Sequence, residues 1–178
     1  MRFAISLLVA ASFALSMPFA LGQERIVSDD ASQLPKPVRA TRAAMLAAAK
    51  AADLAALQAI IDGQGAPIQL GFGGAETAAD FATGNSQTGD GLDVLADLVD
   101  ILEAPYAKVD DGEGGSFYIW PYLAGMDDLT TLTDVDKVVA YQLIMPDALP
   151  DFIDYGGWLS FRTIIDEDGS WQAWVAGD

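Results

Sequence analysis

The hydrophobic pattern of the chain changes at Pro105, and this change limits the folds that are open to it. Up to this proline, apolar residues recur every three or four positions over 38–62 and again over 91–104, which predicts two amphipathic helices. Gly63 follows the first helix, and Pro105 ends the second. Between them, residues 68–72 predict a short strand-like piece, residues 75–83 a helical turn or two, and the glycine-containing residues 84–91 a loop.

After Pro105 the pattern becomes that of β-strands. Apolar stretches flank a glycine-rich turn at 110–115, and further stretches flank the turn at 166–169, so each pair predicts a β-hairpin. The expected strands cover residues 106–109, 116–120, 158–165 and 170–175. Thr133 is suited to cap a helix over 134–144 between the hairpins. This order predicts an α+β fold, in which helices pack on a small antiparallel sheet of hairpins.

The first 22 residues have the three-part organisation of an export signal. Arg2 provides a positive start, residues 3–19 are uncharged and mostly apolar, and small residues occupy the −3 and −1 positions before a cut after Gly22. The alternative is an uncleaved membrane anchor, but the apolar run is short for the about 17–25 residues that a span requires. We therefore expect a signal peptide at 1–22 and a mature protein that is periplasmic or secreted, away from the membrane.

The rest of the chain divides into a lead-in and one domain. Residues 23–36 are mostly polar, and we expect them to be a flexible N-terminal segment. Residues 37–178 are then a single α+β domain, because a chain of this length can bury one core. The oligomeric state is not indicated by any pattern in the sequence.

The chain contains neither cysteine nor histidine, and this excludes several kinds of active site. A Ser-His-Asp triad, a Cys-His pair and a zinc site with imidazole or thiolate ligands all require one of these residues. The glycine-rich segment at 68–76 lacks both the GxGxxG spacing and a P-loop lysine. We find no other catalytic or cofactor motif, so we expect a non-catalytic binding or accessory protein without catalytic residues, cofactor or metal.

The acidic residues are concentrated in one part of the chain. Residues 53–178 contain 23 acidic groups and three basic ones, a net charge of −20. This charge repels phosphate backbones, which excludes nucleic acid as a partner. The expected partner is a cationic protein, and the alternative is that the charge only keeps the protein soluble. Helical spacing places five carboxylates on one face, which is the predicted partner-binding surface: Asp90, Asp93, Asp97, Asp100 and Glu103.

Aromatic residues near the second hairpin support an alternative function, a carboxylate-based glycan hydrolase or a sugar-binding module. Its expected ligand-binding residues are Arg162, Trp120, Tyr122 and Trp158, with Trp171 and Trp174 as further candidates. Arg162 would either form a salt bridge with a carboxylate or bind an anion in a pocket. The hypothesis requires exposed tryptophans, because aromatic residues in strands also serve as core residues.

Calcium binding is a third hypothesis, since carboxylates cluster in both hairpin turns. These carboxylates are Asp110, Asp111 and Glu113 in the first turn and Asp166, Glu167 and Asp168 in the second. Neither turn matches the twelve-residue pattern of an EF-hand. Turns made of Asp and Gly are also common for purely conformational reasons.

Residues 117–178 combine several short motifs. They are Tyr118-Ile119-Trp120-Pro121-Tyr122, the run from Asp127 to Thr133, Asp154-Tyr155-Gly156-Gly157, Arg162 and the ending DG-x-W-x-x-x-V-A-G-D. In these motifs the chain resembles a family of uncharacterised exported proteins of Gram-negative bacteria. In that family a signal peptide and a helical region precede such a segment. The resemblance implies export, and it implies no catalytic residues because the family has no assigned activity.

Overall fold

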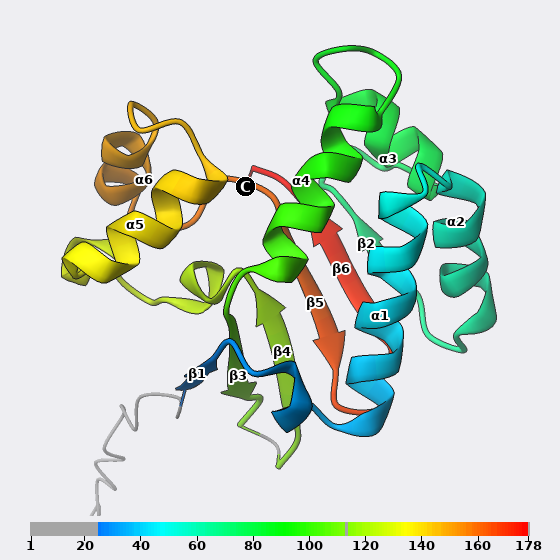
Figure 1. Ribbon diagram of the computed structural model, residues 1–178, viewed down its shortest axis with the longest axis horizontal. Coiled ribbons are helices and arrows are strands. Elements are labelled where there is room, and N and C mark those ends of the chain that lie inside the picture. Colours follow the sequence, from blue (N-terminus) through cyan, green and yellow to red (C-terminus); the bar gives the residue numbers. More distant parts are fainter. Residues whose placement is uncertain (1–24, 113, 178) are drawn as a thin grey trace, which may run out of the picture.

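The computed structural model describes residues 25–112 and 114–177, and these residues form six α-helices and a six-stranded sheet (Figure 1). The helices are α1 (Lys36–Lys50), α2 (Leu54–Gly63), α3 (Ala78–Asn85), α4 (Leu92–Glu103), α5 (Asp134–Leu143) and α6 (Leu149–Tyr155). The strands are β1 (Arg25–Ser28), β2 (Gln69–Leu70), β3 (Tyr106–Asp110), β4 (Ser116–Trp120), β5 (Arg162–Asp166) and β6 (Trp171–Val175). Short 3-10 turns are η1 (Ala31–Gln33), η2 (Tyr122–Gly125) and η3 (Leu129–Thr131). The fold is α+β, and the predicted signal peptide lies outside the described residues.

The sheet has the strand order β1-β3-β4-β5-β6-β2. Both predicted hairpins form, as β3–β4 and β5–β6, and antiparallel pairing of β4 with β5 joins them. At one edge β1 pairs antiparallel with β3, and at the other edge β2 runs parallel to β6. The predicted strand-like piece near residue 70 is therefore part of the same sheet, through a parallel pairing that was not expected.

The two faces of the sheet are buried against different helices. Along β4, Tyr118 and Trp120 point into a core that α1–α4 cover, while Phe117 and Ile119 point into the opposite core. That opposite face is covered by η2, η3, α5 and α6, which stand apart from α1–α4 in Figure 1. Burial on both sides explains why the strands are rich in large apolar and aromatic residues.

A β-bulge in β6 brings Trp171 and Trp174 to the same face of the sheet. Ile164 pairs with Ala173, but Ile165 pairs with Trp171, so β6 contains one extra residue at this point. In a regular strand, residues three apart would face opposite sides. Both indoles instead enter the core under α1–α4, with their ring centroids 5.7 Å apart.

A buried hydroxyl anchors one of these indoles. The Oγ1 atom of Thr163 accepts a hydrogen bond from Trp171 Nε1 at 2.7 Å and donates one to the carbonyl of Ala173 at 2.8 Å. The Trp171 Nε1 also lies 3.0 Å from that carbonyl oxygen. A buried polar group is costly unless it is paired, and these contacts satisfy both side chains.

The lead-in expected to be flexible over 23–36 is structured where it is described. β1 places Arg25 opposite Val109 of β3, and the Arg25 guanidinium donates to the Gly125 carbonyl at 2.7 Å. η1 and the start of α1 follow directly. The polar composition misled the prediction because the contacts that hold this segment come from residues far away in the sequence. Residues 25–36 therefore pack on the same fold as residues 37–177.

The single long helix expected over 38–62 is divided into α1 and α2. Ala52 adopts a left-handed conformation (φ 54°) between them, and the Asp53 amide donates to the Ala48 carbonyl at 2.9 Å. The Asp53 carboxylate then caps α2 by accepting from the Ala56 amide at 2.9 Å. The break was missed because it contains neither glycine nor proline. It lets α2 fold back to pack beside α1.

No helix in the part of the chain that the structure describes combines the length and apolar character needed to cross a membrane.

Substituting alanine for Gly169 and Gly112 separates a steric clash from backbone strain. Both glycines have positive φ, +93° and +78°, so alanine is strained at either position. A Cβ on Gly169 would also lie 2.8 Å from the Pro37 Cβ, whereas nothing lies within 4 Å of one on Gly112. We expect Gly112→Ala to lower the free energy of unfolding by about 1 kcal/mol and Gly169→Ala by about 2–4 kcal/mol in urea denaturation. Equal losses would contradict tight packing of the second hairpin turn against α1.

Candidate functional site

The acidic residues of the predicted partner-binding surface do not share one role. Hydrogen bonds to Asp93 come from Ser86 Oγ at 2.5 Å and from the Gln87 amide at 2.6 Å, so its carboxylate organises the loop before α4. The bond from Ser86, together with the amides of this loop, lowers the pKa of Asp93 to about 2. Glu103, at the other end of α4, forms an ion pair with Lys50 of α1. Both residues therefore have partners within the fold.

Asp97 lies in the middle of this surface and is half-buried. Burial, followed by repulsion from Asp100 and Asp93, raises the pKa of Asp97 to about 6. Asp100, one turn further on, is exposed. Along the predicted surface, Asp93 and Glu103 at the two ends are bonded to other residues of the fold. Asp97, in the middle, carries an uncompensated charge.

Basic residues of the N-terminal region also serve the fold. The guanidinium of Arg42 donates from Nε and Nη2 to the Leu102 carbonyl, at 2.9 and 2.6 Å, and so satisfies a carbonyl at the C-terminal end of α4. Burial lowers the pKa of Arg42, against the attraction of Glu103. Arg42 and Lys50 are thus both bound to groups at the C-terminal end of α4. The negative charge of the C-terminal half of the chain therefore remains largely uncompensated.

The aromatic residues predicted to bind a ligand are buried. Trp120, Trp158, Trp171 and Trp174 are each at most 6% exposed, so none offers a free face for stacking on a sugar. Trp120 belongs to the core under α1–α4, whereas Tyr122 and Trp158 belong to the core on the other side of the sheet. The structure does not bring these residues together in one site.

Arg162 has no carboxylate partner among residues 25–112 and 114–177, in contrast to the predicted salt bridge. Its Nη1 atom donates to the carbonyls of Gly177 at 2.8 Å and Trp158 at 3.2 Å. Its guanidinium carbon lies over the ring of Phe72, 5.7 Å from the centroid. Arg162 therefore ties the C-terminal end of the chain and the loop after β2 to β5.

The hairpin turns provide little for a metal ion. In the second turn, the Asp166 and Asp168 carboxylates accept hydrogen bonds from the amides of Glu167 and Ser170, which is the conformational role of Asp in turns. Of the first turn's carboxylates, Glu113 is outside the described residues. Within residues 25–112 and 114–177, no group of three or more acidic side chains is placed to hold a metal.

A row of exposed apolar side chains runs along α5. No pattern in the sequence predicts it, because only the fold decides which face of a helix is covered. The row consists of Val135, Val138 and Tyr141, with exposed fractions of 73, 59 and 47%. Spacing of three residues places them on one side of the helix. Met145, 72% exposed, follows just beyond the extended C-cap residue Ile144. We call these three side chains, together with Met145, the α5 face. The opposite side of α5 is buried, with Ala140 fully enclosed.

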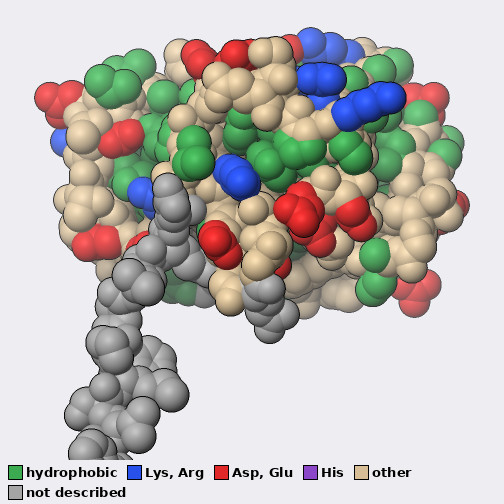
Figure 2. All heavy atoms as spheres, turned by 90° about the horizontal axis from the view of Figure 1, so that it is seen from below, with side chains coloured by type: hydrophobic (Ala, Val, Ile, Leu, Met, Phe, Trp, Pro, Cys, Tyr) green, Lys and Arg blue, Asp and Glu red, His purple; other side chains and the backbone are tan. Residues whose placement is uncertain are grey.

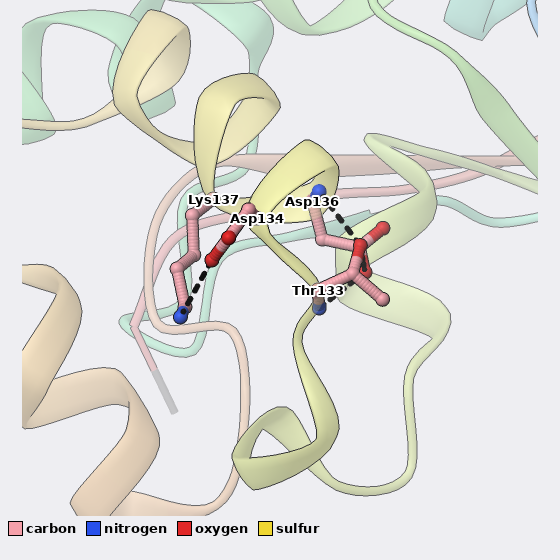
Figure 3. Close-up of polar contacts among 4 residues, drawn as sticks. All are labelled: Thr133, Asp134, Asp136 and Lys137. Atoms are coloured by element: carbon pink, nitrogen blue, oxygen red, sulfur yellow. Dashed lines mark hydrogen bonds and ion pairs between the residues drawn. The ribbon is translucent and has the colours of Figure 1, made fainter.

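The beginning of α5 is fixed by a capping box. Thr133 Oγ1 donates to the Asp136 carboxylate at 2.6 Å and accepts from the Asp136 amide at 3.3 Å, as predicted for Thr133 (Figure 3). Tyr122 of η2 also donates to Asp136. Although burial opposes ionisation of Asp136, the bonds from Thr133 and Tyr122 lower its pKa. Asp134 and Lys137 form an ion pair on the outside of the same turn (Figure 3).

The region that carries the α5 face is acidic. Residues 122–158, here called the acidic lobe, contain seven aspartates and one lysine, a net charge of −6. All of these aspartates except Asp136 are exposed. On the molecular face drawn in Figure 2, several Lys and Arg side chains lie along one margin and a few others lie at the centre and left, while acidic side chains are spread across the face. The α5 face is thus an apolar strip within a negative surface.

Substitution of Asp97 tests the strain within the α4 surface. Because its folded pKa of about 6 lies above the ordinary 3.8, the native protein binds the proton more tightly, and stability falls as the pH rises from about 4 to about 6. We expect Asp97→Asn to raise the melting temperature at pH 7 by about 2–4 °C, the effect of about 1 kcal/mol once solvent screening of a half-buried group is allowed for. The gain should vanish below about pH 4.

The matched control is Asp154→Asn, which removes an exposed carboxylate of α6 far from α4 in the sequence. It should not reproduce the pH-dependent gain. A gain for Asp97→Asn that persists unchanged at low pH would contradict the electrostatic explanation.

Comparisons with known proteins assign no function to these sites. No family model matches the sequence, and neither a curated protein nor a solved structure matches it.

Proposed function

We propose that this protein is an exported, non-catalytic binding protein whose α5 face docks a cationic, amphipathic segment of a partner protein. The observation that carries the proposal is the α5 face, with three exposed apolar side chains on α5 and a fourth, Met145, just beyond its C-terminal end. Contiguous exposed apolar side chains within a polar surround are typical of interaction sites. A helix that presents such a row can pair with a second helix through contacts spaced by three and four residues.

The charge of the acidic lobe selects the kind of partner. A net charge of −6 in residues 122–158 attracts a cationic segment and increases its rate of encounter. The same charge disfavours a second copy of this chain, since two acidic lobes would be brought face to face. Asp147, which is exposed and lies two residues beyond Met145, is suited to meet Lys or Arg of the partner. Asp134, at the other end of the α5 face, already pairs with Lys137.

The surface lies on a fixed support. The buried side of α5 packs in the core formed with η2, η3 and α6, and Tyr122 joins η2 to the N-terminal turn of α5. A pre-formed surface loses less entropy on binding than one that must become ordered. This differs from the α4 surface predicted from the sequence, where Asp93 and Glu103 already have internal partners.

Export is supported by the signal-like residues 1–22 and by the resemblance of residues 117–178 to a family of exported proteins. A periplasmic or secreted location would place the α5 face in contact with other exported proteins.

A pair of designed peptides tests the proposed partner chemistry. The first is an amphipathic helix of Leu and Lys, about 18 residues or five turns long, and the second replaces each Lys with Glu. We expect the Leu/Lys helix to bind, measured by fluorescence anisotropy, and the Leu/Glu helix not to bind. Binding should weaken as salt is raised, because part of the attraction is electrostatic. A Leu/Lys peptide of the same composition in scrambled order should bind at least about tenfold more weakly, a loss of about 1.4 kcal/mol.

Variants of the α5 face locate the binding. The double variant Val138→Ser with Met145→Ser should weaken the Leu/Lys helix at least about tenfold. The control, Val27→Ser with Leu92→Ser, removes two exposed apolar side chains elsewhere and should leave binding unchanged. Equal binding by both double variants would overturn the proposal. It would also be overturned if the free protein is a dimer that the α5 variant splits, because the occupant would then be a second copy.

A further inference from the structure

A hollow lies at the end of the parallel strand pair, on a different part of the molecule from the α5 face. It has a volume of about 420 Å³, within the usual range of small-molecule sites. The loop Gly71–Gly74 after β2 and residues Ala176 and Gly177 after β6 form one side, and α3 forms the other. Ligands commonly bind outside the carboxyl ends of parallel strands, which is the position of this hollow.

The loop lies directly on a buried aromatic ring. Gly71 has a positive φ of +63°, and a Cβ there would lie 3.1 Å from the Phe81 ring. Only glycine allows the backbone to pass this close while adopting that conformation. Phe81 in turn packs on Trp174, with ring centroids 4.5 Å apart. The wall of the hollow is therefore part of the core and is fixed in place.

Phe72 provides an exposed aromatic surface at the hollow. Its side chain is 54% exposed, while the guanidinium of Arg162 lies 5.7 Å from the ring centroid. Hydrogen bonds to two backbone carbonyls hold Arg162, so the ring rests on an anchored cation. An exposed phenylalanine that is positioned in this way can stack against the apolar face of a ligand.

Two polar side chains of α3 also line the hollow, Asp80 and Asn85. The Asp80 Oδ2 atom accepts from the hydroxyl and amide of Thr77, and Asn85 donates from Nδ2 to the Phe81 carbonyl at 2.8 Å. These bonds fix both groups. The second oxygen of Asp80 and the amide oxygen of Asn85 accept no hydrogen bond from any described residue. Both can therefore accept hydrogen bonds from hydroxyl groups.

We propose that this hollow binds one ring of a neutral sugar, with its C–H face on Phe72 and its hydroxyls on Asp80 and Asn85. Charge favours a neutral ligand. Asp80, which lines the hollow, and Arg162, behind Phe72, carry opposite charges, so for an anion or a cation the attraction of one group is offset by the repulsion of the other. Phe72, Asp80 and Asn85 are not among the tryptophans that the sequence suggested as sugar-binding residues. The site is also independent of the α5 face.

Three sugars with the same ring test the charge preference: glucose, glucuronate and glucosamine. Each is titrated to about 100 mM into ¹⁵N-labelled protein, with galactose, mannose and N-acetylglucosamine as further neutral probes. We expect at least one neutral sugar to shift the amide signals of Gly71–Ala75 and Asn85. If glucose binds, glucuronate and glucosamine should bind at least tenfold more weakly. If another neutral sugar binds instead, the charged derivatives of that sugar are compared with it.

Variants separate stacking from charge. Phe72→Ser should weaken the sugar at least tenfold, and Asp80→Asn should bring the affinity for the anionic sugar toward that for the neutral one. The control Val27→Ser should change neither affinity. The proposal is overturned if no neutral sugar shifts the loop signals, if the shifts map to another surface, or if a charged sugar binds best. None of these outcomes affects the α5 face, which is assayed with peptides.

Discussion

Pairing of β4 with β5 is the contact on which the rest of the structure depends. It joins two hairpins into one sheet whose central strands are covered on both faces. Without cysteine the protein has no disulfide to hold its layers together, so stability comes from this double burial. The bulge in β6 adds to this burial, because it places Trp171 and Trp174 in the same core. In a regular strand, residues three apart would lie in the two different cores.

Some of the charged side chains of this protein bond to other parts of the fold, and the others remain at the surface. The apolar side chains divide in the same way, into buried and exposed groups. Arg25, Arg42 and Lys50 are engaged by the sheet-covering elements and by α4. The acidic lobe has one lysine, Lys137, which pairs with Asp134, and its other aspartates form no ion pair with any described residue. The exposed apolar side chains of the α5 face lie in the same region. A surface that combines exposed apolar groups with one sign of charge is more selective than either feature alone, since the apolar part contributes affinity and the charge excludes wrong partners.

Local patterns predicted the elements that depend on local interactions. The amphipathic α4, the capping of α5 by Thr133 and both hairpins were recognised because periodicity, caps and turns are recorded in neighbouring residues. Strand β1 and the parallel pairing of β2 with β6 were not recognised, because both depend on residues far away in the sequence. The same reason applies to the sites. Which side of α5 is covered, and that Phe72 lies beside Asp80, follow from tertiary packing that no local pattern records.

The position of the sheet edges in the sequence has a kinetic consequence. β2 pairs with residues 173 and 174, about a hundred positions further on. Helices α1–α4 pack on a sheet in which β3, β4, β5 and β6 all come later in the chain than these helices. Contacts of such long range form slowly, because a large loop must close before they stabilise anything. A chain that emerges N-terminus first therefore exposes four amphipathic helices before it has a sheet to cover. Completion of this fold must wait until β6 has been synthesised.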